Sequence, residues 1–307
     1  MNADRRDARA IEVIDAHHHC WDLSQGNYPW LQQAYLGEQF FLGGYEQLRR
    51  NYLPDDYRAD TEGYRIVGTV HIEAERARTE QVEETHWLHQ LQQRSGLPTV
   101  FVPHASFTQP DLIEVLSAHT AFAQVRGIRS KPVTASAPGL SVRGQAGSMQ
   151  DPAWLEGLAQ LENFGLSWDL RVPFWHLEEA AEVARQFPGI PIILNHTGLP
   201  LDRSPAGLAV WRKGMQALAD APNVYVKLSE LGLRGGYWDP VSNRQVLREA
   251  LAIFGSDRAV FASNLPVCRL SASFQSIVAA VLEALCDFDQ QAIDNVFAHN
   301  ARRFYRM

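Results

Sequence analysis

Lysine, cysteine and long apolar segments are all scarce in this sequence. Only three of its 28 basic residues are lysines, its formal net charge is −7, and it has no run of basic residues to follow a phosphate backbone. Nucleic acid is therefore not expected as a partner. The three cysteines, Cys20, Cys268 and Cys286, lie far apart and form no C-x-x-C pair. This spacing argues against a disulfide scaffold and against a zinc ribbon.

No apolar run is long enough to cross a bilayer, and the N-terminal stretch MNADRRDARA carries charges with no apolar core behind it. We therefore expect a cytoplasmic protein that does not bind membranes. Its 307 residues suit one barrel-sized domain or two ordinary ones, and the hydrophobic share of 46% is that of a globular protein. The sequence carries no mark of its oligomeric state, so a homo-oligomer stays open.

Eight short apolar or β-branched runs recur along the chain, and helical patterns separate most of them. The runs are residues 13–19, 65–74, 99–106, 124–131, 165–172, 190–198, 224–231 and 258–267. Strands that alternate with helices indicate an α/β fold, and eight such units in a chain of this length predict a (β/α)8 TIM barrel. We expect residues 1–12 to form a tail and residues 13–307 a single barrel domain, with the helices of residues 274–305 covering its outside.

Two connections do not fit the repeat. Residues 20–62, rich in aromatic and turn residues, stand where the first strand should join its helix, and residues 132–150 are rich in Gly, Ser and Pro. A long loop at the C-terminal end of a barrel is usually a lid or a pocket wall. We therefore expect residues 20–62, with Tyr28 and Trp30, to cover a substrate pocket.

Three consecutive histidines end the first predicted strand. Because alternate side chains of a strand share a face, we expect Asp15, His17 and His19 to point the same way. Two imidazoles so placed can bind one divalent metal or donate hydrogen bonds to one substrate oxygen.

The other predicted strands also end in polar residues. These include His71 and Glu73 on the second, His104 on the third, Arg129 on the fourth, Asp169 on the fifth, Asn195 and His196 on the sixth, Lys227 on the seventh, and Ser263 and Asn264 on the eighth. In a barrel covered on both sides, we expect each polar face to point inward. For His104, Lys227 and Asp15 a structural role is at least as good an explanation as catalysis. Histidines on three strands that converge with Arg129 favour a functional site, because burying them together costs several kcal/mol.

Five motifs occur in order at these strand ends, and a sixth closes the chain. They are H-x-H (17–19), G-I-R (127–129), N-H-x-G-x-P (195–200), V-K-L-S (226–229), F-A-S-N-x-P-V (261–267) and N-A-R-R-F-Y (300–305). Together they resemble the amidohydrolase superfamily, and within it the amidohydrolase-2 branch. That branch holds sugar-lactone and dicarboxylate-lactone hydrolases together with metal-dependent aromatic-acid decarboxylases.

This resemblance implies a role for each matching residue. His17, His19 and His196 would bind a divalent metal, zinc or manganese, or in metal-free members would contact the substrate. Arg129 would hold a carboxylate or hydroxyl groups with its planar fork of donors.

The eighth strand departs from the family pattern, which commonly has a metal-binding, water-activating aspartate where this chain has Asn264. An amide can orient water but cannot accept its proton. The missing carboxylate could come from Glu73, Asp169 or Glu230, or the enzyme could work without metal. We favour Glu73, because alternation places it inward with His71, and Glu230 is its rival.

The leading hypothesis is a hydrolase that opens a small lactone of a sugar acid or carboxylated ring compound, in carbohydrate or aromatic catabolism. His17, His19 and His196 would polarise the carbonyl, with or without one divalent metal, and Asn264 would position the attacking water. The expected substrate contacts are Arg129, His71, Tyr28, Trp30, Lys227, Asp169 and Glu230. One alternative is a metal-dependent decarboxylase of an aromatic acid, and another is a barrel that only binds a ligand.

Overall fold

The computed structural model describes residues 8–307, so residues 1–7 of the predicted tail lie outside the described range. Eight parallel strands occur, each within its predicted run except that the first begins one residue earlier. They are β1 (Glu12–His18), β2 (Arg65–Ile72), β3 (Val100–Val102), β4 (Gly127–Ile128), β5 (Ser167–Leu170), β6 (Ile192–Leu194), β7 (Val224–Leu228) and β8 (Ala259–Phe261). They form two sheets, in the orders β1-β2-β3 and β4-β5-β6-β7-β8.

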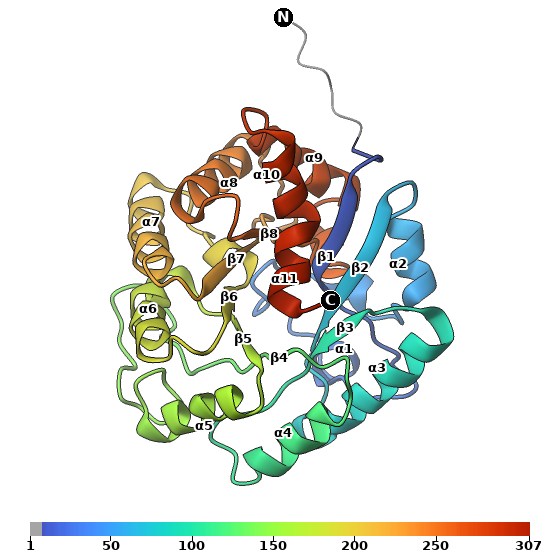
Figure 1. The fold of residues 1–307 in the computed structure, drawn as a ribbon, viewed down its shortest axis with the longest axis vertical. Coiled ribbons are helices and arrows are strands. Elements are labelled where there is room, and N and C mark those ends of the chain that lie inside the picture. Colours follow the sequence, from blue (N-terminus) through green and yellow to red (C-terminus); the bar gives the residue numbers. More distant parts are fainter. Residues whose placement is uncertain (1–7) are drawn as a thin grey trace, which may run out of the picture.

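Backbone hydrogen bonds join these two sheets at both seams. At one seam the Asn264 N–H donates to the His17 carbonyl at 2.7 Å, and at the other the Phe101 N–H donates to the Gln124 carbonyl at 2.9 Å. The eight strands therefore close into a ring in chain order, and the helices surround this ring (Figure 1). The predicted TIM barrel is confirmed.

Eight helices pack around the outside of the strands. They are α2 (Pro54–Asp60), α3 (Gln81–Ser95), α4 (Leu112–Thr120), α5 (Pro152–Asn163), α6 (Leu177–Gln186), α7 (Pro205–Ala219), α8 (Pro240–Phe254) and α9 (Phe274–Ala284). The Asp151 side chain accepts a hydrogen bond from the Ala153 N–H at the start of α5, and Gly96 ends α3 in the left-handed conformation. Among residues 8–307, no helix combines the length and the apolar character that a bilayer crossing requires.

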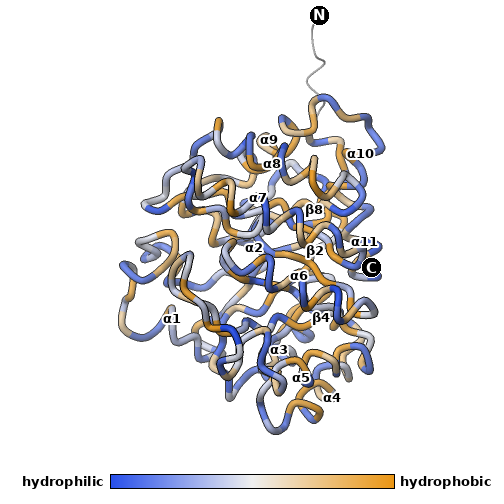
Figure 2. Tube along the Cα trace, turned by 90° about the vertical axis from the view of Figure 1, so that its left-hand side faces the viewer, coloured by the Kyte–Doolittle hydropathy of each residue, from blue (hydrophilic) through white to orange (hydrophobic). Residues whose placement is uncertain are grey.

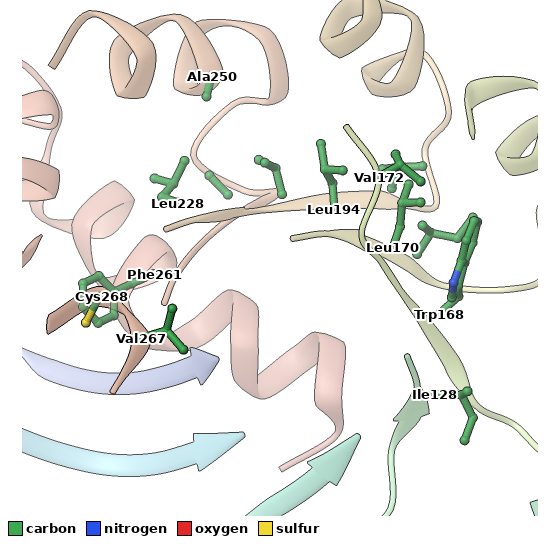
Figure 3. Close-up of a cluster of buried hydrophobic side chains, with 14 of the residues drawn as sticks. Ile128, Trp168, Leu170, Val172, Leu194, Leu228, Ala250, Phe261, Val267 and Cys268 are labelled. Atoms are coloured by element: carbon green, nitrogen blue, oxygen red, sulfur yellow. The ribbon is translucent and has the colours of Figure 1, made fainter. Parts of the chain in front are cut away.

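Apolar side chains on the outer face of the strands pack against these helices. Trp168, Leu170, Leu194 and Leu228 belong to this layer, and Figure 3 shows Leu228 below Ala250 of α8. A second apolar cluster fills the barrel interior. Its strand residues are Ile14, Ala16, Val70, Ile72, Val100, Val102, Ile193, Val260 and Ala262.

The C-terminal helix α11 (Asn300–Tyr305) closes the N-terminal end of the barrel instead of covering its outside. Phe304 and Tyr305 join the interior cluster, and the Arg306 guanidinium donates to the Gly165 carbonyl, just before β5, at 2.9 Å. Figure 1 shows α11 across the centre of the strand ring, and Figure 2 shows it on the opposite side of the molecule from α1 (Pro29–Gln32). The prediction that residues 274–305 all lie outside is wrong for α11, because its aromatic side chains fill the base of the interior.

A β-bulge in β1 changes the directions of its side chains. Asp15 pairs with Thr69 and His18 pairs with His71, so β1 uses one more residue than β2 between these positions. Asp15 consequently points outward, where the Tyr57 hydroxyl of α2 donates to it at 3.1 Å. The prediction that Asp15 shares a face with His17 is wrong, because the bulge between them reverses the alternation.

The rule that polar strand faces point inward holds for only part of the barrel. Asp169 on β5 and Lys227 on β7 do form an ion pair inside it. On β2, however, Val70 and Ile72 face the interior, so Thr69 and His71 point outward. The interior apolar cluster, which includes side chains of α11, fills the space beside β1, β2 and β3.

Glu84, on the buried face of α3, makes the stability of the fold depend on pH. Its side chain is 1% exposed and accepts a hydrogen bond from the Ala74 N–H at 2.9 Å. Burial, followed by the nearby charge of Glu73, raises the pKa of Glu84 to about 7. The folded protein therefore keeps a proton that the unfolded chain releases at its lower, ordinary pKa. Stability falls as the pH rises between those two values.

We expect Glu84→Gln to remove this loss. At pH 8 the free energy of unfolding of the variant should exceed that of the parent by about 3 kcal/mol, since one pKa unit corresponds to about 1.4 kcal/mol. At pH 4 the two should agree. Urea unfolding at both pH values measures the difference, with Glu83→Gln on the exposed side of α3 as the control. An equal gap at both pH values would contradict the explanation.

Candidate active site

A cavity of about 620 Å³ opens at the C-terminal ends of the strands. Its floor is polar and comes from residues at or after the strand ends, namely His19, Arg129, Lys131, Arg171, His196 and Asn264. Its outer wall is aromatic and comes from the 20–62 connection, with Trp30, Phe40, Phe41 and Tyr45. Trp30 on α1 is held by a hydrogen bond from its Nε1 to the Ala74 carbonyl at 3.0 Å and stacks on Phe40. A polar floor thus faces an apolar wall across the cavity.

Three predicted histidines form a cluster at the floor. The ring centroid of His17 lies 5.0 Å from that of His19 and 4.4 Å from that of His196. His17 is fully buried, whereas the other two line the cavity. Burial, reinforced by nearby positive charges, lowers the pKa of all three rings well below the ordinary value. The cluster is therefore neutral at neutral pH.

A chain of hydrogen bonds links His19 to a carboxyl group through Asn264. His19 Nδ1 lies 2.8 Å from the Ile72 carbonyl oxygen, and its Nε2 lies 3.2 Å from Asn264 Oδ1. The Asn264 amide contacts Glu230 Oε2 on its other side. Burial raises the pKa of Glu230 to about 7, although the Asn264 amide opposes this shift. Oε1 of Glu230 lacks a hydrogen-bond partner within residues 8–307.

Glu73, the carboxylate that the sequence favoured as base, forms ion pairs with two arginines. Its Oε1 accepts from Arg129 Nε at 2.7 Å, and its Oε2 accepts from Arg78 at 3.1 Å. Although burial alone would raise it, the charges of Arg129 and Lys131 hold the pKa of Glu73 well below its ordinary value. Neither Glu73 nor Glu230 lines the cavity, but Glu230 contacts Asn264, which does. The carboxyl group beside Asn264 is therefore that of Glu230, and the preference for Glu73 does not fit the structure.

Besides Glu230, four of the predicted substrate contacts do not line the cavity. His71 faces outward on β2, with its Nε2 3.2 Å from the Cys20 carbonyl oxygen, and Tyr28 is fully buried behind the pocket wall. Lys227 and Asp169 do point inward, but they pair deep in the barrel, below the histidines. Strand alternation identifies which side a residue faces and leaves its depth in the barrel open. Arg129, Trp30 and Asn264 do reach the cavity.

Arg171 is a cavity residue that the sequence analysis did not select. Its guanidinium carbon lies 5.4 Å from the centre of the Phe41 ring, and it makes no ion pair or hydrogen bond with any of residues 8–307. Burial, with the charge of Arg129, lowers its pKa to about 10, so it remains a cation. Lys131, also in the floor, is by contrast paired with Glu75. Arg171 continues the inward alternation of Ser167 and Asp169, and that signal could have found it.

Backbone strain is concentrated around this cavity. Of the seven described non-glycine residues with positive φ, six follow strand ends at the cavity, namely Glu75, His196, Thr197, Leu199, Glu230 and Asn264, with φ between 50° and 65°. Only Arg306 lies elsewhere. Each left-handed residue of this kind costs about 1–3 kcal/mol, and such strain persists mainly where function requires the geometry. The strained turns direct His196, Glu230 and Asn264 toward one another.

The donor set of the floor does not fit a divalent metal. Within the described part of the chain, no three His, Cys, Asp or Glu side chains have an arrangement that could hold a metal ion. Asn264 contributes no charge, and Lys227 Nζ lies 3.4 Å from His17 Nδ1. The positive charges of Arg171, Arg129 and Lys227 also act on His196. These positive side chains would repel a divalent metal cation placed among them.

The sequence model of the amidohydrolase family matches residues 14–307. The chain belongs to this family. Among its relatives, the protein y4mH of Sinorhizobium fredii is 37% identical over 297 residues, covering 97% of this chain and 99% of that protein. The L-fucono-1,5-lactonase of Burkholderia multivorans is 27% identical over 281 residues, covering 87% and 86%. The amidohydrolase fold thus extends over the whole described barrel.

Solved structures agree with this assignment. A Burkholderia multivorans amidohydrolase crystallised with bound HEPES has a TM-score of 0.77 and is 25% identical, covering 96% of this chain and 99% of that one. A second crystal form of that amidohydrolase contains zinc. Zinc therefore binds in a structural neighbour, whereas the floor of this chain has an amide and an ammonium group near its histidines.

We expect Asn264→Asp to create a metal site where the parent has none. The new carboxylate would add the negative charge that the histidines lack and should raise zinc affinity at least about tenfold. Calorimetric titration of zinc into the full chain measures this change. Asn264→Ser removes the amide without adding charge, so it should bind zinc as weakly as the parent. Tight zinc binding by the parent would refute the assignment of the floor as unsuited to metal.

Proposed function

We propose that this amidohydrolase opens a lactone by hydrolysis. The observation that carries the proposal is the carboxyl group of Glu230, which contacts Asn264 of the cavity floor and has a pKa of about 7. A general base works best when its pKa is close to the working pH. The L-fucono-1,5-lactonase relatives support the same reaction class.

In the proposed reaction, water attacks the lactone carbonyl carbon and Glu230 accepts its proton. His19 and His196 line the cavity and would contact the substrate, and Asn264 would orient the water, because an amide cannot take up a proton. Collapse of the tetrahedral intermediate breaks the ring C–O bond. The departing alkoxide then takes the proton back from Glu230, and the product is an open-chain hydroxy acid.

The cavity favours a lactone with an anionic substituent and an apolar face. Arg171 offers a guanidinium without a carboxylate partner at the floor, and Phe41 and Trp30 form an apolar wall opposite. A guanidinium binds carboxylates through two parallel hydrogen bonds. A volume of about 620 Å³ suits a small ring compound. The aromatic connection 20–62 would act as the lid over this substrate.

Two other functions would give different products. A metal-dependent decarboxylase of an aromatic acid would release carbon dioxide, and the donor set of the floor does not favour it. A barrel that only binds its ligand would release nothing. A panel of carboxylated and neutral lactones with a pH indicator separates these cases, because only hydrolysis produces a new acid.

We expect Glu230→Gln to lower kcat by about 100-fold or more, since a positioned general base contributes 10²–10⁴-fold. For the parent, kcat/KM should rise with pH through about 7 as Glu230 loses its proton, and the residual rate of the variant should lack this rise. The matched control is Glu84→Gln, another buried carboxyl group with a pKa of about 7 that lies away from the cavity. Equal losses in the two variants would rule out Glu230 as the base.

We also expect Arg171→Gln to raise KM for a carboxylated lactone by about 10–100-fold, the value of a lost hydrogen bond to a charged group. KM for a neutral sugar lactone should stay within a factor of two or so, because that substrate offers no anion to Arg171. Steady-state kinetics with both substrates provides the comparison. A uniform loss for both lactones would indicate a general structural effect instead.

A further inference from the structure

Lys227 lies directly beneath the histidine cluster, inside the barrel. It is fully buried, and its ammonium donates to Asp169 Oδ1 and, at 3.4 Å, to Nδ1 of His17. Asp169 also accepts from the Tyr305 hydroxyl and, at 3.0 Å, from the Asn195 amide. The carboxylate of Asp169 holds Lys227 in its ammonium form.

The ammonium group decides which nitrogen of His17 carries the proton. An ammonium has three donors and no acceptor, so the nitrogen facing it has to present a lone pair. In a neutral imidazole one nitrogen is a donor and the other an acceptor. The proton of His17 is therefore on Nε2. This Nε2 is buried and has no hydrogen-bond partner among the residues that the structure describes.

His19 differs from His17, because both of its ring nitrogens face acceptors. Its Nδ1 lies 2.8 Å from the Ile72 carbonyl oxygen and its Nε2 lies 3.2 Å from Asn264 Oδ1. A neutral imidazole has one donor, so it can donate to only one of these two oxygens. The contacts of His17 thus select one tautomer, whereas those of His19 do not.

We propose that Lys227 is a positioning residue that fixes His17 as its Nε2–H tautomer, so that His17 does not bind a metal at the cavity floor. A metal ligand must offer its lone pair, and the only lone pair of this tautomer faces the ammonium. This inference does not rest on the proposed lactone hydrolysis.

Long-range ¹H–¹⁵N NMR of the full chain tests the tautomer directly. Spectra of His17→Gln and His19→Gln assign the two rings by the signals that disappear. We expect the Nε2–H pattern for His17 at pH 7. A Nδ1–H or doubly protonated His17 would overturn the inference, whether or not the protein hydrolyses lactones.

Replacement of the ion pair tests the role of Lys227. Lys227→Met combined with Asp169→Asn removes both charges, so that no buried charge is left unpaired. In this double variant the His17 signals should shift toward the Nδ1–H form or a mixture of tautomers. Lys213→Met, at an exposed lysine of α7, should leave the His17 signals unchanged. An unchanged His17 tautomer in a folded double variant would contradict the role of Lys227.

Discussion

The buried ion pair between Lys227 and Asp169 connects the main parts of this barrel. Taking two charges out of water is unfavourable unless their remaining hydrogen-bonding groups are also satisfied. Here Tyr305 of α11 and Asn195 after β6 supply further donors to Asp169, while His17 of β1 accepts from Lys227. The helix that closes the base, three strands of the barrel and the histidine cluster therefore depend on one pair of charges.

The positive charge of the interior and the chemistry of the floor are consistent with each other. The charges of Arg129, Arg171 and Lys227 all lower the pKa of His196. Asn264 stands where the family commonly has a carboxylate. A site with this balance attracts negative charge, whether on a substrate carboxylate or on an oxygen during reaction. The amide at position 264 then serves as a link between His19 and Glu230, both of which it contacts.

Local patterns in the sequence were sufficient for the fold and for part of the site. Alternation and length identified all eight strands, and the motifs at their ends located His19, Arg129, His196 and Asn264 at the cavity. The bulge in β1 could not be read in this way, because it arises from pairing with β2, far along the chain. Glu230 follows β7 in a left-handed conformation, φ 50°, so alternation could not give its direction. The ion pair that occupies Glu73 is formed with Arg129, which lies two strands away, so alternation along one strand could not show it.

The position of α11 has a consequence for the order in which the molecule can be assembled. Ile14 belongs to the first strand and Phe304 to the last helix, yet both lie in the same interior cluster. During synthesis, the strands leave the ribosome long before the side chains that fill the space between them. Without α11, the apolar side chains at the base of the barrel would be exposed to water, and exposed apolar surface favours association between chains. Docking of α11 is therefore required to complete the interior of the barrel.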